Sequence, residues 1–113
     1  MGTINTALTE AVYYILLSLT EPLHGYGIMQ RVEILSSGRL RLAAGTLYGA
    51  LNTLLEKGWI TALPQIHDAR NKKEYQITED GRAVLHGEIE RLTELAENGR
   101  RLLAGDGDGE DCR

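Results

Sequence analysis

Three helix-ending residues divide the first half of this chain into short segments of helical periodicity. Pro22 disfavours helical geometry in the residue before it, and Gly38 and Gly58 suit the end of a helix. Between these breaks, apolar residues recur every three or four positions, which is the spacing of one helix face. The pattern predicts helices over residues 7–19, 24–35 and 44–57.

The helix predicted over 44–57 has two contrasting faces. Its apolar stripe consists of Leu47, Ala50, Leu51, Leu54 and Leu55. The opposite face carries small and polar residues, namely Gly45, Thr46, Gly49, Asn52, Thr53 and Glu56, with Tyr48 on its flank. Gly and Thr lower the helix propensity of this face, so its composition needs an explanation other than helix stability.

The second half of the chain predicts a hairpin and a long helix. Strand-like runs over 59–66 and 73–77 are rich in Ile, Leu and Tyr, and a polar turn sequence joins them. Thr78 is suited to cap a helix that continues to about residue 103. Further upstream, the alternation over 39–42 is long enough for one short strand at most.

This order of elements is that of a winged helix-turn-helix. We therefore expect a mostly α fold with a small β-hairpin: a winged helix-turn-helix domain over 1–78, followed by a long C-terminal helix over 79–103. Residues 104–113 form a Gly- and Asp-rich acidic tail of the kind that is typically disordered.

The helix over 79–103 has more apolar positions than so small a core can cover. The first helix also has a second, partly apolar flank, so we expect both helices to pack against a second copy of the chain. The residues predicted at this dimer interface are Tyr14, Leu17, Leu85, Ile89, Leu92, Ala96 and Leu103.

The net charge of −4 and the pI near 5.3 describe the whole chain rather than its middle. The tail over 104–113 holds four acidic residues and one Arg, whereas 39–75 holds six basic and three acidic residues. The middle of the chain is therefore mildly basic and suited to an acidic partner.

The outer face of the 44–57 helix and the hairpin together predict a DNA-binding surface. A helix fits the major groove, and small residues permit close approach to base edges. Asn52 can bond an adenine edge, Thr46 can bond a phosphate or a base, and Tyr48 can donate its hydroxyl to a phosphate. At the hairpin tip, the basic side chains of Arg70, Lys72 and Lys73 would contact the neighbouring backbone. The competing interpretation is a solvated helix face with a charged turn.

Metal and cofactor sites are not expected. His24, His67 and His86 lie in three different predicted elements, and no metal-binding spacing of His or Cys occurs. Cys112 cannot form an internal disulfide because it is the single cysteine.

Two other features are open to two interpretations. Gly25 and Gly27 near a helix start could bind an anion, but we favour close helix packing as their role. Tyr13, Tyr14 and Trp59 could line a pocket for an aromatic ligand, although core or interface packing is the commoner role of such residues.

Several classes of protein do not fit this sequence. The longest apolar run, around residues 11–19, is short for a membrane span, and no positively charged start leads into it. We therefore expect a cytoplasmic protein that does not bind membranes. No P-loop, dinucleotide-binding motif or nucleophile elbow occurs, so we expect no enzymatic activity.

Four stretches of the chain resemble the PadR family of bacterial transcriptional regulators. They contain HGYGI at 24–28, GTLYGAL at 45–51, EKGWI at 56–60 and YQITEDGR at 75–82, in this order. The resemblance covers most of residues 8–99, and the chain is similar to the short type with one C-terminal helix. Gly49 stands where many members have Pro.

The resemblance implies a winged helix-turn-helix that dimerises through its first and last helices and represses transcription. It places DNA contacts on the residues already selected, which are Thr46, Tyr48, Asn52, Arg70, Lys72 and Lys73. We expect a homodimer on an inverted-repeat operator, and a small-molecule effector is left open. The alternative is a winged-helix adaptor that binds other proteins and not DNA.

Overall fold

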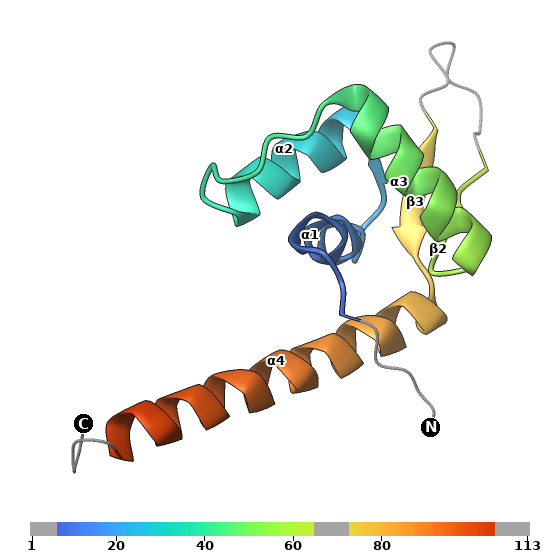
Figure 1. The fold of residues 1–113 in the computed structure, drawn as a ribbon. Helices are drawn as coiled ribbons and strands as arrows, with labels where there is room; N and C mark the ends of the chain where they lie inside the picture. Colours follow the sequence, from blue (N-terminus) through green and yellow to red (C-terminus); the bar gives the residue numbers. More distant parts are fainter. Residues whose placement is uncertain (1–6, 65–72, 106–113) are drawn as a thin grey trace. The chain divides into compact units, whose positions relative to one another are not determined.

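The computed structural model describes residues 7–64 and 73–105, and these divide into two compact units. The first unit covers residues 7–85, and the described part of the second covers 86–105. The elements, coloured along the chain in Figure 1, are α1 (Glu10–Ser18), β1 (Leu23–His24), α2 (Gly25–Leu35), α3 (Ala44–Lys57), β2 (Ile60–Ala62), β3 (Glu74–Ile77) and α4 (Glu79–Gly105). The predicted fold class, a mostly helical winged helix-turn-helix with a long last helix, is confirmed.

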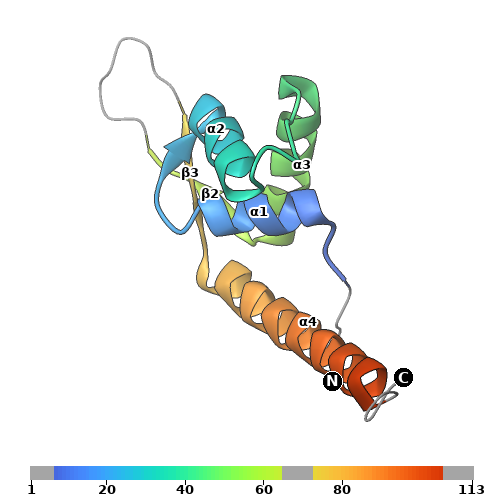
Figure 2. The ribbon, with the colours of Figure 1, turned by 90° about the vertical axis from the view of Figure 1, so that its left-hand side faces the viewer.

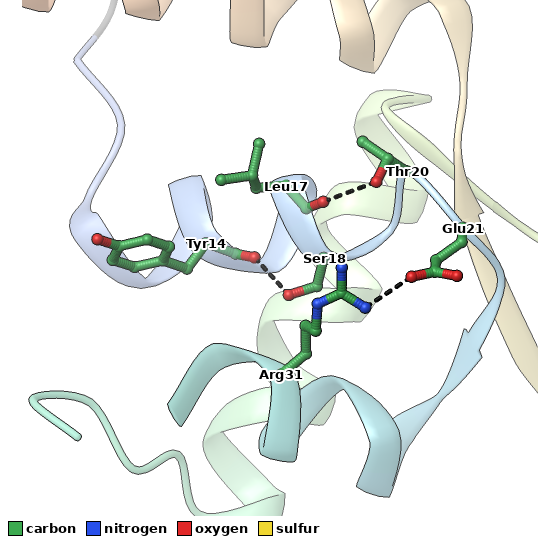
Figure 3. Close-up of polar contacts among 6 residues, drawn as sticks. All are labelled: Tyr14, Leu17, Ser18, Thr20, Glu21 and Arg31. Atoms are coloured by element: carbon green, nitrogen blue, oxygen red, sulfur yellow. Dashed lines mark hydrogen bonds and ion pairs between the residues drawn. The ribbon is translucent and has the colours of Figure 1, made fainter. Parts of the chain in front are cut away.

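Helix α1 begins later than predicted because Thr9 caps it. The Thr9 hydroxyl accepts the Val12 N–H at 3.1 Å, which satisfies one of the free donors of the first turn. At the other end, the Ser18 hydroxyl donates back to the Tyr14 carbonyl at 2.7 Å, as Figure 3 shows. The helix therefore covers nine residues rather than the whole run over 7–19.

The turn after α1 is held to α2 by an ion pair. Arg31 of α2 and Glu21 of the turn lie 2.6 Å apart, and the Thr20 hydroxyl donates to the Leu17 carbonyl at 3.1 Å (Figure 3). Both charged side chains are substantially exposed, so this ion pair contributes little to stability and mainly orients the turn.

The connection between α2 and α3 contains no strand, although the sequence allowed one short strand there. Within residues 39–42, Leu40 and Leu42 pack against the core as the alternation suggests. The segment is held instead by Ser36, whose hydroxyl accepts the Leu40 N–H at 3.0 Å. One-sided burial of alternating residues therefore does not require a neighbouring strand. Gly38 follows the end of α2 as predicted, but the left-handed conformation begins one residue earlier, at Ser37.

Helix α3 is confirmed over the predicted residues, and Gly58 ends it with a φ of +79°. The hairpin is also confirmed, with shorter strands than predicted: β2 pairs with β3 in antiparallel register, Ile60 opposite Ile77. A third strand, β1, was missed. It pairs with the other edge of β3, giving the order β1-β3-β2.

The hydrophobic core of the 7–85 unit lies among its three helices and the sheet. Helix α1 packs on α2, α2 on α3, and α3 on β2, an arrangement that the two ribbon views in Figures 1 and 2 allow the reader to follow. The core residues are Ile15, Leu16, Leu19, Ile28, Val32, Leu47, Leu51, Leu54, Ile60, Tyr75, Ile77 and Leu85. Helix α3 thus contributes its leucine stripe to the core, and its opposite face lies outside it.

Helix α4 begins at the predicted cap. Thr78 accepts the Gly81 N–H at 3.1 Å, and its hydroxyl also donates to the carbonyl of Gly58 at 2.7 Å. Gly81 lies against the chain at Trp59, because a Cβ at Gly81 would overlap the Trp59 carbonyl oxygen and come within 2.7 Å of Ile77 Cγ1. The start of α4 is thus fixed to the end of α3. Within the described residues, no helix is both long and apolar enough to cross a membrane.

Candidate nucleic-acid interface

The outer face of α3 is exposed to solvent, as predicted. Leu47, Leu51 and Leu54 are buried on the inner face, which fixes the rotation of the helix about its axis. As a result, all the residues predicted on the opposite face are exposed: Gly45, Thr46, Gly49, Asn52, Thr53 and Glu56. The structure therefore brings Thr46 and Asn52 to one accessible helix face.

This face of α3 is low and open. A Cβ at Gly45 or at Gly49 would meet no atom within 4 Å, so neither glycine is required by packing inside the described chain. The Thr53 hydroxyl donates to the Gly49 carbonyl at 3.3 Å, in its own helix. Because most residues around Asn52 on this face are small, the helix backbone can approach a binding partner closely.

Tyr48 lies on the flank of this face, with 46% of its surface exposed. Its phenol contacts the first residue of α2, since a Cβ at Gly25 would come within 2.8 Å of Tyr48 Cζ. The sequence predicted that Gly25 permits close helix packing, which is confirmed, but it did not identify Tyr48 as the neighbour. Burial raises the pKa of the Tyr75 phenol on β3, and the nearby Tyr48 phenol adds to the rise.

Only one of the three basic residues predicted at the hairpin tip lies in the described part of the chain. Lys73 is exposed and immediately precedes β3. Arg70 and Lys72 lie outside the described residues. An exposed ammonium beside the start of a wing strand is suited to contact with a phosphate.

Two further basic residues of the middle region form ion pairs within the first unit. Arg39 pairs with Glu10 of α1, and Arg41 Nε lies 3.2 Å from Glu33 of α2. Both pairs are exposed to solvent, so an external anion can compete for either guanidinium. The positive charge predicted for 39–75 is therefore partly offset by acidic residues of α1 and α2.

Helix α4 carries a separate set of exposed apolar side chains. The exposed fractions are 40% for Ile89, 40% for Leu92, 53% for Leu95, 67% for Leu102 and 75% for Leu103. Ala96 is exposed as well. Three other residues predicted at the dimer interface are less accessible: Tyr14 and Leu17 of α1 are half-buried, and Leu85 is 5% exposed within the core.

The aromatic side chains considered for a ligand pocket make other contacts. The rings of Tyr13 and Tyr14 pack edge to face with centroids 5.6 Å apart. The Trp59 ring lies 5.1 Å from the ammonium of Lys57. All three aromatic side chains also pack against the core, which agrees with the favoured interpretation.

Neither His24 nor His86 belongs to a metal-binding cluster. His24 occupies the cap position at the start of α2 and is half-buried, while His86 lies exposed in α4. Across residues 7–64 and 73–105, no group of three or more His, Cys, Asp or Glu side chains could hold a metal ion. His67 and Cys112 lie outside the described residues.

Comparison with known families decides the class of this protein. The sequence model of the transcriptional regulator PadR-like family matches residues 14–87, which is more than half of the chain. The chain belongs to this family. The matched region includes α2, α3, the hairpin strands and the start of α4. A comparison with curated proteins gave no match.

Solved structures of PadR proteins share the fold. A PadR family transcriptional regulator of Eggerthella lenta has a TM-score of 0.67 and 24% identity, over 80% of this chain and 79% of that one. A PadR-like transcription factor of Bacteroides fragilis has a TM-score of 0.66 and 24% identity, over 81% of this chain and 87% of that one. PadR of Bacillus subtilis in complex with operator DNA has a TM-score of 0.59 and 24% identity, over 70% of this chain and 45% of that one.

Proposed function

We propose that this PadR family protein is a sequence-specific DNA-binding repressor that acts as a homodimer in the cytoplasm and has no catalytic activity. The observation that carries the proposal is the outer face of α3, where exposed Thr46 and Asn52 stand among small residues that packing does not require. The structural similarity to a PadR protein bound to operator DNA supports the same conclusion.

The proposed interface divides its contacts between bases and phosphates. The Asn52 side chain has both a donor and an acceptor, so it can form two hydrogen bonds with the edge of an adenine in the major groove. Thr46 and Tyr48 carry hydroxyls that can donate to phosphates and fix the position of α3. Lys73, with Arg70 and Lys72 of the hairpin tip, would supply charge that favours every DNA sequence alike.

The exposed apolar residues of α4 support the homodimer. Exposed fractions of 40–75% for five Leu and Ile side chains on one helix are costly in water, and a second copy offers the same apolar residues in return. Ile89, Leu92, Ala96 and Leu103 recur at the alternating spacing of a helix-pairing seam. Tyr14 and Leu17 of α1 are half-buried and are also assigned to the proposed interface, whereas Leu85 belongs to the core and supports the start of α4.

A twofold dimer would present two copies of α3, so we infer an inverted-repeat operator. If both helices enter successive major grooves on one side of the duplex, the half-site centres lie about 34–36 Å apart. Occupation of such a site in a promoter blocks access of other proteins to the same DNA, which is the simplest route to repression.

Titration against a randomised duplex library over a salt series tests this function. The association constant should fall steeply with salt, because binding releases counterions from each contacted phosphate. Lys73→Ala should reduce the slope of log K against log salt by about one unit, the change expected when one phosphate is no longer neutralised. A protein that acts as an adaptor for other proteins would show no duplex binding at any salt concentration, and that result would overturn the proposal.

A further inference from the structure

Gly25 is buried at the first position of α2, directly against the side chain of Tyr48 in α3. A Cβ built on Gly25 would overlap the Tyr48 hydroxyl and come within 2.8 Å of Tyr48 Cζ. Carbon atoms that are not bonded do not approach this closely in proteins, because repulsion rises steeply inside van der Waals contact. The observed direction of the Tyr48 ring and a side chain at position 25 are therefore incompatible.

The backbone at Gly25 is not free to move away from Tyr48. The two residues before it form β1, in which Leu23 pairs with Tyr75 and His24 with Glu74 of the central strand. The next turn of α2 places Ile28 in the core with no exposed surface. The start of α2 is thus fixed by the sheet on one side and by the core on the other, so the Tyr48 side chain is the part that would shift.

Gly27, two residues along, provides an internal comparison. A Cβ at Gly27 would lie 3.4 Å from Leu23 Cδ2 and 3.5 Å from His24 Cε1, which are close to ordinary van der Waals contacts. Position 27 therefore accepts a methyl group with little rearrangement. The close approach is a property of Gly25 and not of the glycine-rich start of α2 in general.

We propose that Gly25 is a positioning residue for Tyr48: the missing side chain at position 25 sets the direction of the Tyr48 phenol and thereby places its hydroxyl for donation to a DNA phosphate. This inference rests on the proposed DNA-binding function. It gives Gly25 of the HGYG stretch a role in positioning Tyr48, which differs from the anion binding considered for this stretch. The Tyr48 phenol contacts the start of α2 with its hydroxyl end, and 46% of the surface of the residue is exposed to solvent.

Duplex affinities of a double-mutant cycle test the coupling between the two residues. Gly25→Ala should weaken binding to all duplex sequences alike by about tenfold, the loss expected for one hydrogen bond to a charged phosphate. Tyr48→Ala should cause a similar loss, and adding Gly25→Ala to it should cause no further loss, because the hydroxyl is already gone. Gly27→Ala is the matched control and should bind like the wild-type protein.

A second readout follows the Tyr48 ring without DNA. The chain has five tyrosines, so ¹⁹F NMR of protein labelled with 3-fluorotyrosine gives few signals, and Tyr48→Phe assigns that of Tyr48. Gly25→Ala should shift the Tyr48 signal and the signal of neighbouring Tyr75, whereas Gly27→Ala should leave both in place. If Gly25→Ala lowers the melting temperature, the double variant with Tyr48→Ala should restore it.

The inference is overturned if Gly25→Ala leaves the Tyr48 signal and the duplex affinity unchanged, or if its loss of affinity is the same with and without the Tyr48 hydroxyl. Failure of the wild-type protein to bind any duplex would instead refute the proposed function. In that case the ¹⁹F spectra still decide whether Gly25 sets the direction of the Tyr48 ring.

Discussion

Substitutions of Leu92 in α4 should weaken the proposed dimer. Leu92 lies on α4 in the series Ile89, Leu92, Ala96 and Leu103, and 40% of its surface is exposed in the single chain. Complete burial of a Leu side chain contributes about 1.5–3 kcal/mol, so covering this remaining fraction contributes on the order of 1 kcal/mol per protomer. Leu92→Ala should therefore weaken dimerisation by about tenfold or more, since the residue occurs twice in the interface.

Leu92→Asp should have a much larger effect, because the dimer would bury two unpaired carboxylates. Each costs several kcal/mol, which is enough to raise the dimer dissociation constant by a factor of roughly 1,000 or more. Sedimentation equilibrium at micromolar concentration should show twice the chain mass of 12.5 kDa for the wild-type protein and the single mass for Leu92→Asp.

Thr93→Asp is the matched control for this experiment. Thr93 is the next residue of α4, is exposed, and lies outside the predicted apolar series. The same new charge at position 93 should leave the protein dimeric. A wild-type chain that is monomeric at micromolar concentration would contradict the proposed dimer, and so would dissociation of the dimer to the same extent by both substitutions.

Three further predictions concern the stability of the folded protein. Thr78→Ala removes both the cap on Gly81 and the hydrogen bond to Gly58, so the free energy of unfolding in denaturant should fall by about 1–2 kcal/mol. The Thr53 hydroxyl bonds only within its own helix, so Thr53→Ala should cause a smaller loss. Gly81→Ala should destabilise the protein by about 1–3 kcal/mol because its Cβ would overlap the Trp59 carbonyl, while Gly87→Ala, in open space on the same helix, should stabilise it by up to about 1 kcal/mol. The pKa of Tyr75 is raised above 10.0 in the folded state, so the protonated phenol contributes fully to stability below pH 10, and this contribution is lost as the pH rises through the folded pKa. Tyr75→Phe should therefore reduce the fall of the melting temperature at alkaline pH, and an unchanged fall would contradict the raised pKa of Tyr75.

Features that depend on neighbouring residues in the sequence were predictable. The bounds of α3 follow from its apolar stripe and from the glycine that ends it, and the start of α4 follows from the Thr78 cap. The exposure of Asn52 was predictable for the same reason, because a buried leucine stripe determines which residues face outward. These predictions needed only helical geometry and local hydrogen bonding.

Features that depend on long-range contacts were not predictable in the same way. Strand β1 is two residues long and exists only because Leu23 and His24 pair with β3, about fifty residues further along the chain. The alternation over 39–42 indicates that Leu40 and Leu42 pack against the core, but it does not show that this segment lacks a partner strand. Likewise, helical spacing could not separate Leu85, which faces the core of its own chain, from the exposed residues that follow it in α4.

The close approach of Gly25 to Tyr48 belongs to the same group. The sequence indicates that a glycine near the start of a helix permits packing, but only the relative placement of α2 and α3 shows which side chain occupies the space. The contribution of Arg39 and Arg41 to the charge of the surface also depends on placement, because Glu10 and Glu33 come from other elements.

Base selection from a randomised duplex library, with the wild-type protein and Asn52→Ala in parallel, tests most directly whether the outer face of α3 reads DNA. The wild-type protein should enrich an inverted repeat. Asn52→Ala should enrich the same repeat with discrimination lost at one position in each half-site, a loss of about 1–3 kcal/mol if Asn52 forms two hydrogen bonds with its base. An Asn52→Ala protein that binds with an unchanged base preference would contradict the assignment of this face.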